Sequence, residues 1–418
     1  MSAVLKNPEL TVNFERLQSD IDMLATIGRR EDHGIYRMAF TDADMEARAW
    51  LKGRMEEAGL EIYEDGAANV HGRYKYDYQN PSVMMGSHID SVPGAGHLDG
   101  ALGVMVALEC VRRIKELNLP LKHPLEVVAF TDEEGRFGGM PGSQAMSGQL
   151  SPEDIYNARD LNGETLIDVM KARDLNAMDM LRARRNPDSI HAFLELHIEQ
   201  GPVLDRTGIP IGIVEGIAGV RKWDVRLIGA ANHAGTTPMD MRRDAFLGVA
   251  ELAGELPRIL EEEGSATSVA TIGRVELKPG AANVVPGQAD FILEVRDTDP
   301  EILNNLANGF RRTLSAIARR RDLMFEFEVL SDIEPVKCDP GIMNAIAEVT
   351  EAMNIRTKQM PSGAAHDTQF LARLTRAGMI FVPSKDGRSH SPAEWTAWED
   401  IETGANVALN TLYRLASG

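Results

Sequence analysis

Four short apolar runs, each followed by a histidine or an acidic residue, constrain the fold of this chain more than any other feature. Each run has the length and composition of a buried strand, although periodicity alone does not separate such a strand from a buried piece of helix. The four runs are PSVMMGS (81–87), LEVVAF (125–130), HAFLEL (191–196) and AGMIFVP (377–383).

The segment between the first two runs, residues 99–117, has the pattern of an amphipathic helix. Leu108, Val111 and Ile114 form one face, and basic residues occupy another. The two runs and this segment therefore predict a β–α–β unit. Strands that alternate with helices indicate an α/β fold, in which helices cover both faces of a parallel or mixed sheet.

The composition changes near Gly216, and we expect a smaller unit inserted there. Two helical stretches and three β-like stretches follow, and this pattern is typical of a small α+β unit: DAFLGVAELAGELPRIL, EILNNLANGFRRTLSAIARR, KWDVRLIG, VATIGRVEL and ADFILEVRD. We predict one larger domain built from residues 1–215 and 331–418, interrupted by residues 216–330. At the start of the chain, residues 14–60 have helical spacing, and Gly59 is expected to end the last helix there.

Charge and cysteine usage exclude several classes of partner. Lys plus Arg is 44 and Asp plus Glu is 63, so the formal net charge is −19, which disfavours a nucleic-acid or anionic-membrane surface. Cys110 and Cys338 lie too far apart in the sequence to indicate a disulfide framework, and no apolar run is long enough to span a bilayer. We expect a cytoplasmic protein whose partners are small molecules.

Side chains that can bind metal ions follow each of the four runs. Ligands of open α/β sheets bind beyond the carboxyl ends of the strands, so these side chains should meet at one edge. They are His88 and Asp90 after the first run, Asp99 at the start of the helix, Glu133 and Glu134 after the second run, His197 after the third and His390 after the fourth.

Three imidazoles and two carboxylates, with another acid beside them, suffice for a site that holds two divalent cations. Zinc, manganese, cobalt and nickel all accept such ligands, so the ligand types do not choose the metal. Two adjacent cations activate a water molecule and polarise a carbonyl, as amide hydrolysis requires, and a second acid can move the proton. A single histidine is more often structural, and we assign that role to His33, His71, His97, His123 and His191.

Six motifs in this order resemble the carbamoylase/hydantoinase branch of the M20 metallopeptidase-like amidohydrolases. The resemblance covers nearly the whole chain and rests on GSHIDSVPGAGHLDG, TDEEGRF, ELHIEQGPVL, NHAGTTPM, NVVPG and GRSHSPAE. It implies a zinc-exopeptidase-like catalytic domain with an inserted lid and dimerisation domain, and hence a homodimer.

The resemblance also implies roles for the metal-capable residues. His88 and His197 would hold different ions, Asp99 would bridge them, and Glu133 would be the general base. Glu134 and His390 would complete the two coordination spheres. Asp90 would support His88 by accepting a hydrogen bond from its other ring nitrogen.

Further residues are implied to bind the substrate. His233 would stabilise the oxyanion, and Arg296 together with Asn283 would hold a substrate carboxylate. Gln200 would contribute from the catalytic domain. His366 would contact the substrate from GAAHD, where Ala365 stands in place of the glycine that the family often has.

These implications predict an enzyme that hydrolyses an N-carbamoyl amino acid to the free amino acid, carbon dioxide and ammonia. An allantoate or ureidoglycolate amidohydrolase would use the same ions and the same carboxylate clamp. A dipeptidase or aminoacylase is disfavoured, because related peptidases usually place an aspartate where this chain has His197. A binding protein without turnover is disfavoured by Glu133, since a pure binder has no use for a base.

Overall fold

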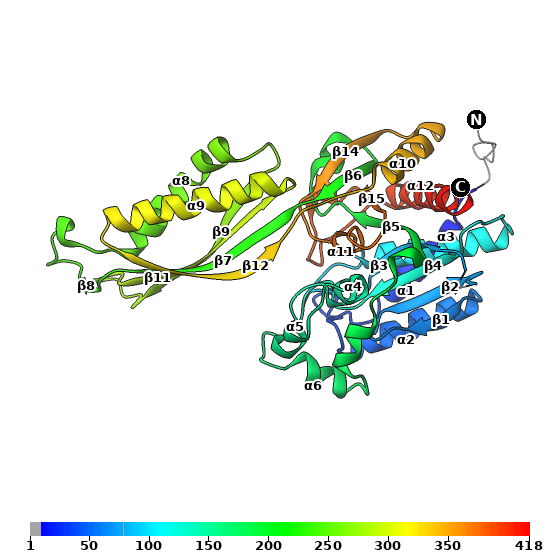
Figure 1. Cartoon of the computed structure of the whole chain (residues 1–418), viewed down its shortest axis with the longest axis horizontal. Helices are drawn as coiled ribbons and strands as arrows, with labels where there is room; N and C mark the ends of the chain where they lie inside the picture. The colour runs from blue at the N-terminus through cyan, green and yellow to red at the C-terminus, as the bar shows by residue number, and fades with distance from the viewer. Residues whose placement is uncertain (1–9, 78) are drawn as a thin grey trace. The chain divides into compact units, whose positions relative to one another are not determined.

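The computed structural model describes residues 10–77 and 79–418, and the chain divides into two compact units (Figure 1). Unit 1 contains the chain up to Glu215, Cys338–Met360 and His366–Gly418. Unit 2 contains Gly216–Lys337 and Pro361–Ala365. Within the described residues, none of the helices combines the length and apolar character that crossing a membrane would need.

The largest sheet is mixed and has the strand order β1-β2-β4-β3-β5-β15-β6-β13, with β14 also paired to β6. Its inner strands β4, β3, β5 and β15 run parallel, and β2 and β6 flank them in antiparallel orientation. The strands are β1 (Glu61–Glu64), β2 (Val70–Tyr74), β3 (Ser82–His88), β4 (Leu125–Phe130), β5 (Ile190–Ile198), β6 (Ile211–Ile217), β13 (Val336–Lys337), β14 (Thr357–Ser362) and β15 (Ala377–Val382).

The four inner strands are the four apolar runs of the sequence, so the prediction of an α/β fold with a mixed sheet is confirmed. Every residue of β3, β4 and β15 is buried, as expected for parallel strands with helices on both faces. Because the four strands are parallel, their carboxyl ends lie at the same edge of the sheet. The helix predicted between the first two runs is α3 (Ala101–Glu116).

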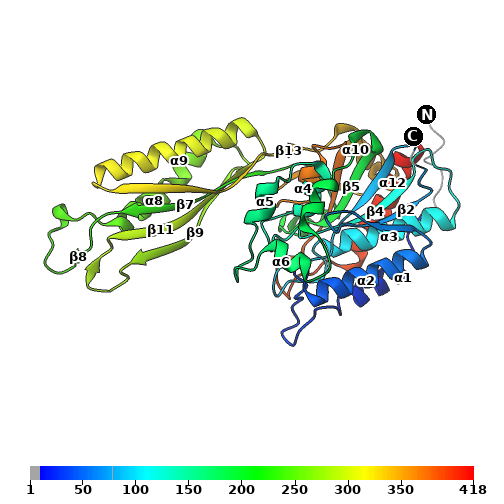
Figure 2. The same ribbon diagram turned by 60° about the horizontal axis from the view of Figure 1, so that its bottom comes forward.

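Alternate residues of the inner strands pack into different cores. On β3, Val83 and Met85 join the main core, whereas Met84 joins a smaller core on the other face. The main core includes residues of α3 and of three other helices labelled in Figure 2, α1 (Phe14–Leu24), α10 (Pro340–Ala352) and α12 (Trp398–Ser417). The smaller core includes residues of α4 (Pro141–Ser147) and α11 (Thr368–Leu371).

The N-terminal segment, for which helical spacing was predicted over residues 14–60, contains two helices and a long connection between them. The structure has α1 and α2 (Asp42–Glu57), separated by turns from residue 25 to residue 41. The buried Arg37 guanidinium explains the break, because it donates to the carbonyls of Leu24, Ile27 and Ile89 at 3.1, 2.9 and 2.6 Å. Gly59, at φ +67°, follows the end of α2 as predicted.

Short helices complete unit 1, and several of them surround a third core that contains Phe40, Phe137, Ile155 and Met170. They are α5 (Pro152–Asn157), α6 (Leu166–Lys171), α7 (Val203–Thr207) and the 3-10 helices η2 (Ala177–Arg182), η3 (Pro187–Ser189) and η5 (Lys385–Gly387).

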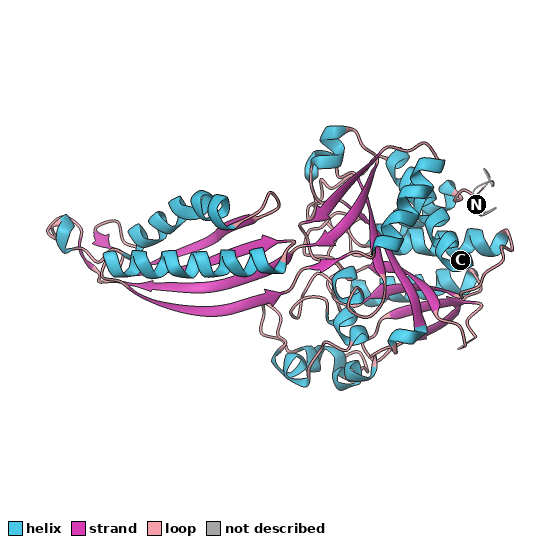
Figure 3. Cartoon of the chain, turned by 45° about the horizontal axis from the view of Figure 1, so that its top comes forward, coloured by secondary structure: helices cyan, strands magenta, loops and turns pink. Residues whose placement is uncertain are grey.

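Unit 2 is an antiparallel sheet of order β12-β7-β11-β9 with two long helices packed on one face (Figure 3). Its main elements are β7 (Gly219–Ile228), β9 (Val269–Lys278), β11 (Gln288–Asp297), β12 (Met324–Ile333), α8 (Ala245–Glu263) and α9 (Pro300–Arg320). A small ribbon pairs β8 (Asn232–His233) with β10 (Val284–Val285), and η4 covers Met239–Met241. The boundary expected at residue 330 falls inside β12.

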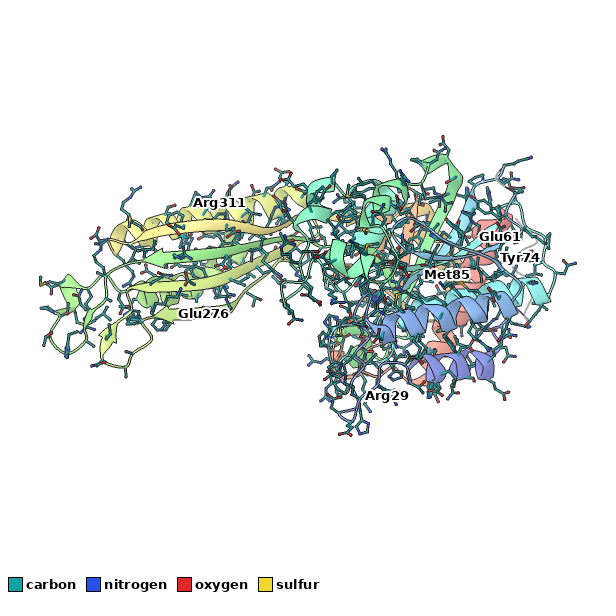
Figure 4. All side chains as sticks on the ribbon, turned by 90° about the horizontal axis from the view of Figure 1, so that it is seen from below. Arg29, Glu61, Tyr74, Met85, Glu276 and Arg311 are labelled. Atoms are coloured by element: carbon teal, nitrogen blue, oxygen red, sulfur yellow. The ribbon has the colours of Figure 1, made fainter. Side chains whose placement is uncertain are left out.

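The two helices of unit 2 begin at clear capping residues. Asp244 and Asp299 each accept hydrogen bonds from two backbone N–H groups of the following helix. The inward faces of α8 and α9 meet Trp223, Phe291 and other residues of the sheet. Figure 4 labels Arg311 on α9, whose guanidinium carbon lies 4.7 Å from the centre of the Phe327 ring.

Candidate functional site

Two buried histidines lie side by side at the carboxyl edge of the main sheet. His88 is the last residue of β3 and His197 the penultimate residue of β5, and these strands are parallel neighbours. Their ring centres are 6.0 Å apart, and each residue is 1 % exposed. The adjacency of β3 and β5 therefore brings together two imidazoles that are 109 residues apart in the sequence (197 − 88).

Asp99 lies opposite both imidazoles and completes a first group of three ligands. Its Oδ1 is 3.7 Å from His88 Nε2 and 3.2 Å from His197 Nε2. Gly100 allows this approach, because a Cβ atom on it would lie 2.3 Å from the His88 ring, and its φ of +62° suits glycine. The three ligand atoms lie within 4.8 Å of one another, close enough to bind one ion.

A second group of three ligands shares the same aspartate. His390 Nε2 lies 3.4 Å from Asp99 Oδ2 and 3.3 Å from Glu134 Oε2. Glu134 belongs to the loop after β4, and the His390 side chain is 48 % exposed. The two carboxylate oxygens of Asp99 thus face two different groups of ligands, which is the arrangement of a bridging ligand.

The structure groups the two buried histidines differently from the predicted distribution. The sequence-based interpretation gave His88 and His197 to different ions, whereas both approach the same oxygen of Asp99. Strand order is the physical reason: two ring-bearing residues at the ends of adjacent parallel strands point into the same space. Glu134 and His390 form the other group with Asp99.

Glu133 lies beside the first group of ligands but belongs to neither. Its Oε2 is 3.5 Å from His88 Nε2, and its side chain is 9 % exposed. Burial, and next the charge of Glu134, raise the pKa of the Glu133 carboxyl well above its ordinary value. A carboxylate with a raised pKa at this distance is suited to take up a proton during a reaction.

The donor set fits divalent cations. Buried polar atoms normally have partners, yet among the described residues His88 Nε2 and Glu134 Oε1 have no hydrogen-bond partner. Burial, and then the charge of Asp99, raise the pKa of Glu134. The protein alone therefore does not neutralise the negative charge of the Glu134 carboxylate. Imidazole nitrogen and carboxylate oxygen are the ligands that zinc and neighbouring metals accept.

Asp90 supports this region in a different way from the one predicted. His88 Nδ1 lies 3.1 Å from the backbone carbonyl of Asp90, and the carboxylate is farther away at 3.9 Å. The Asp90 carboxylate instead accepts from the backbone N–H groups of Glu133 and Glu134, at 3.3 and 3.1 Å. It therefore positions the loop that carries both glutamates.

Gln200 and His366 also lie at the site. Gln200 Nε2 donates to Asp99 Oδ2 at 2.7 Å, and its backbone has a φ of +58°. The buried His366 ring lies 4.5 Å from that of His197, centre to centre. His366, His197 and Glu195 form a further group of closely spaced possible ligands, in which Glu195 accepts from Ser87 and Thr368.

The predicted lid residues lie in unit 2, and the structure does not bring all of them together. His233 on β8 pairs with Val284, and the adjacent Ala234 N–H donates to the Asn283 carbonyl at 2.8 Å. β11 begins at Gln288, shortly after Asn283 in the sequence, and Arg296 lies near its other end. The eight steps along the strand from Gln288 to Arg296 span about 26 Å at ~3.3 Å per residue. Arg296 donates to Glu294 Oε1 and to the Gly363 carbonyl.

The histidines that were assigned structural roles lie outside both groups of ligands. His71 Nδ1 is 3.0 Å from the buried Glu126, and His123 stacks on His191 with ring centres 3.9 Å apart. His97 packs near the Trp395 ring. His33 is exposed in the turn region after α1.

Two residues that contact Asp99 were not among the site residues predicted from the sequence. Ser389 Oγ lies 2.5 Å from Asp99 Oδ2, and Glu394 accepts from the Asp99 N–H at 3.1 Å. Both belong to the GRSHSPAE motif. The motif itself could have indicated them, because it contains polar residues besides His390, which was the only residue of the motif assigned to the site.

Comparison with known proteins identifies similar chains along almost the whole length. Residues 84–414 match the profile of Peptidase family M20/M25/M40. The chain is 40 % identical over 413 residues to the N-carbamoyl-L-amino acid amidohydrolase of Geobacillus stearothermophilus, covering 97 % of this chain and 100 % of that one. It is 34 % identical over 406 residues to the allantoate amidohydrolase of Escherichia coli K12, covering 96 % and 98 %.

A solved structure is similar at the level of the fold as well as the sequence. The crystal structure of an amidase of the hydantoinase/carbamoylase family from Burkholderia multivorans matches with a TM-score of 0.89 and 32 % identity. The match covers 98 % of this chain and 100 % of that one.

Proposed function

The chain belongs to peptidase family M20/M25/M40, and from this premise we propose that it is a metal-dependent amidohydrolase that cleaves the ureido C–N bond of an N-carbamoyl amino acid. The products would be the free amino acid, carbon dioxide and ammonia. The similarity to N-carbamoyl-L-amino acid amidohydrolases over nearly full length supports this class of substrate.

The observation that carries the proposal is the pair of ligand groups that share Asp99, with Glu133 beside them and outside both. His88, His197 and Asp99 would hold one divalent cation, and Asp99, Glu134 and His390 the other. Zinc, manganese, cobalt and nickel all suit these ligands. When bound, such a pair of cations lowers the pKa of a shared water and polarises the carbonyl of the substrate.

The protein's own residues would do the remaining work. Glu133 would accept a proton from the attacking water and pass it to the leaving nitrogen. Asp90 would hold the Glu133 backbone in place through its carboxylate. From unit 2, His233 would donate to the oxyanion and Arg296 would bind the substrate carboxylate.

Unit 2 as observed supports a homodimer as part of this proposal. His233 and Asn283 lie together, whereas Arg296 lies near the other end of β11. One copy of unit 2 therefore cannot place Asn283 and Arg296 beside the same substrate carboxylate. A second copy of the chain would supply one of them to each site, and we propose a cytoplasmic homodimer acting on a small ureido substrate.

An allantoate or ureidoglycolate substrate is the second candidate, because the allantoate amidohydrolase of Escherichia coli also matches over nearly its full length. We expect the highest kcat/KM for an N-carbamoyl-L-amino acid when the purified protein is assayed with Mn, Co, Ni or Zn. The panel should include N-carbamoyl-β-alanine, allantoate, ureidoglycolate and dipeptides. Preference for allantoate would select the second candidate, and inactivity of the metal-loaded protein toward every ureido compound would refute both.

We expect Arg296→Lys to lower kcat/KM for the carboxylate substrate by about 10- to 100-fold, mainly through KM. A hydrogen bond to a charged group contributes about 1.5–3 kcal/mol, and an ammonium cannot reproduce the paired donors of a guanidinium. Arg226→Lys is the matched control, because Arg226 lies on the same sheet in ion pairs with Asp290 and Glu326. Steady-state kinetics that do not separate the two variants would remove Arg296 from the site.

A further inference from the structure

The last residue of the GRSHSPAE motif, Glu394, makes contacts that the proposed function does not use. Its residue is 3 % exposed, and it follows His390 by four positions. Its Oε1 accepts from the backbone N–H groups of Leu98 and Asp99, at 2.8 and 3.1 Å. Its Oε2 lies 2.9 Å from Ser389 Oγ.

Ser389 completes a closed ring of contacts around Asp99. Ser389 Oγ is 2.5 Å from Asp99 Oδ2, the oxygen that faces Glu134 and His390. Glu394 therefore holds the backbone of Asp99 directly, and its other oxygen lies within hydrogen-bond distance of the Ser389 hydroxyl, which also contacts the Asp99 carboxylate. The same contacts tie Asp99 to the loop that carries His390, although these segments are about 290 residues apart in the sequence.

The Glu394 side chain occupies the space next to Gly96, three residues before Asp99. A Cβ atom added to Gly96 would lie 2.3 Å from Cβ, Cδ and Oε1 of Glu394. Any side chain at position 96 would therefore push the Glu394 carboxylate away from the N–H groups that it binds. The observed position of Glu394 therefore depends on a glycine at position 96.

We propose that Glu394 is a positioning residue that orients Asp99 so that its two carboxylate oxygens face different cations. This inference rests on the proposed function, because it assumes that the two groups of ligands bind divalent cations. A carboxylate can bridge only if its plane is fixed relative to both groups. Without Glu394 and Ser389, Asp99 Oδ2 loses the contact with Ser389 and keeps the hydrogen bond from Gln200. We expect binding of a cation by Asp99, Glu134 and His390 to weaken most.

The role assigned to Glu394 depends on hydrogen bonds and not on its negative charge. Ser389 has one hydroxyl proton, so while it donates to Asp99 its oxygen can accept from a donor at position 394. Glutamine provides such a donor in its Nε2, and its Oε1 can still accept from Leu98 and Asp99. Glu394→Gln should therefore keep all of these contacts, whereas Glu394→Ala removes the ones with Leu98, Asp99 and Ser389.

Truncation of Glu394 should leave the protein folded. One side of Glu394 lines an open pocket together with Arg29, His97 and Trp395. Arg29 is exposed on the surface of unit 1, where Figure 4 labels it. Shortening the Glu394 side chain would extend this pocket toward the N–H groups of Leu98 and Asp99, so water can replace the lost carboxylate there and reduce the penalty of an unpaired donor.

The test is calorimetric titration of metal-free protein with Mn²⁺, together with metal analysis after dialysis. We expect wild type to bind two ions, and Glu394→Ala to bind at least one of them 10- to 100-fold more weakly, as is typical when a partner of a ligand is removed. Glu394→Gln should stay within about threefold of wild type, Ser389→Ala should weaken binding, and Glu399→Ala, an exposed control, should not. Thermal unfolding of the metal-free proteins checks that each variant is folded.

The possible outcomes separate the two proposals. If wild type binds no Mn²⁺, the proposed metal-dependent function fails. If wild type binds two ions and Glu394→Ala binds them equally well, the inference on Glu394 is overturned while the function stands. If Glu394→Gln bound Mn²⁺ as weakly as Glu394→Ala, the negative charge of Glu394 would be responsible, and the inference on its hydrogen bonds would also be overturned. If Glu394→Ala does not fold, the Ser389→Ala and Glu394→Gln titrations decide in the same way.

Discussion

Glu133→Gln is expected to lower kcat by about 10²- to 10⁴-fold while leaving the bound metal near two ions per chain. General acid–base catalysis contributes a factor of this size, and glutamine can neither accept nor return the proton. The metal content should be unchanged because Glu133 is outside both groups of ligands, with its Oε2 3.5 Å from His88 Nε2. Kinetics and elemental analysis on the same sample measure the two quantities together.

The neighbouring residue provides a matched control for this prediction. Glu134→Gln makes the same chemical change one position later, but it removes a carboxylate that lies 3.3 Å from His390 Nε2. We therefore expect Glu134→Gln to lose one ion and Glu133→Gln to lose none. If Glu133→Gln were the variant that lost metal, Glu133 would belong to the ligands and another residue would have to be the base.

The sequence predicted the central strands well because parallel strands buried on both faces are continuous apolar runs. Edge strands lack that signal. β12, Met324–Ile333, was not predicted as a strand, because it is largely exposed and carries alternating acidic residues. The position of the break between α1 and α2 was also not predicted, because it depends on the buried Arg37 side chain, whose hydrogen-bond partners include the distant Ile89 carbonyl.

The residues of the candidate site were easier to predict than their grouping. A histidine or glutamate after each apolar run indicates which residues reach the edge of the sheet, since parallel strands end together. The order of strands in the sheet is not written in local sequence, so nothing indicated that His88 and His197 would be neighbours. Contacts such as that of Glu394 with the Asp99 N–H, which join residues 295 positions apart, were invisible for the same reason.

The register of unit 2 limits what sequence motifs can say about the substrate clamp. His233 and Asn283 stand in two motifs of the inserted unit and Arg296 in the stretch ADFILEVRD, and such sequence patterns carry no information on distance. Once β11 is placed between β7 and β9, Arg296 pairs with Val220 and Gln288 with Ile228, at opposite ends of the strand. A clamp that used both ends would need a second copy of the unit, as the proposed homodimer provides.

Asp99→Ala is expected to abolish binding of both cations, whereas His390→Ala should abolish binding of only one. Asp99 is the residue common to the two groups of ligands, and His390 belongs to one of them. An ion present at 1,000 times its Kd stabilises the folded state by about 4 kcal/mol per site, so metal addition should raise the Tm of wild type strongly. His390→Ala should keep part of that rise, and Asp99→Ala should show almost none.

This comparison tests the bridging arrangement without relying on activity. Asp188→Ala, at an exposed position in η3, is the control and should behave as wild type. If Asp99 served only one ion, Asp99→Ala would still bind the other and its Tm would rise on metal addition as far as that of His390→Ala. That result would contradict a shared carboxylate, because the geometry places Oδ1 toward His88 and His197 and Oδ2 toward His390. Equal loss of both ions in Asp99→Ala and His390→Ala would instead mean that the two cations bind only as a pair.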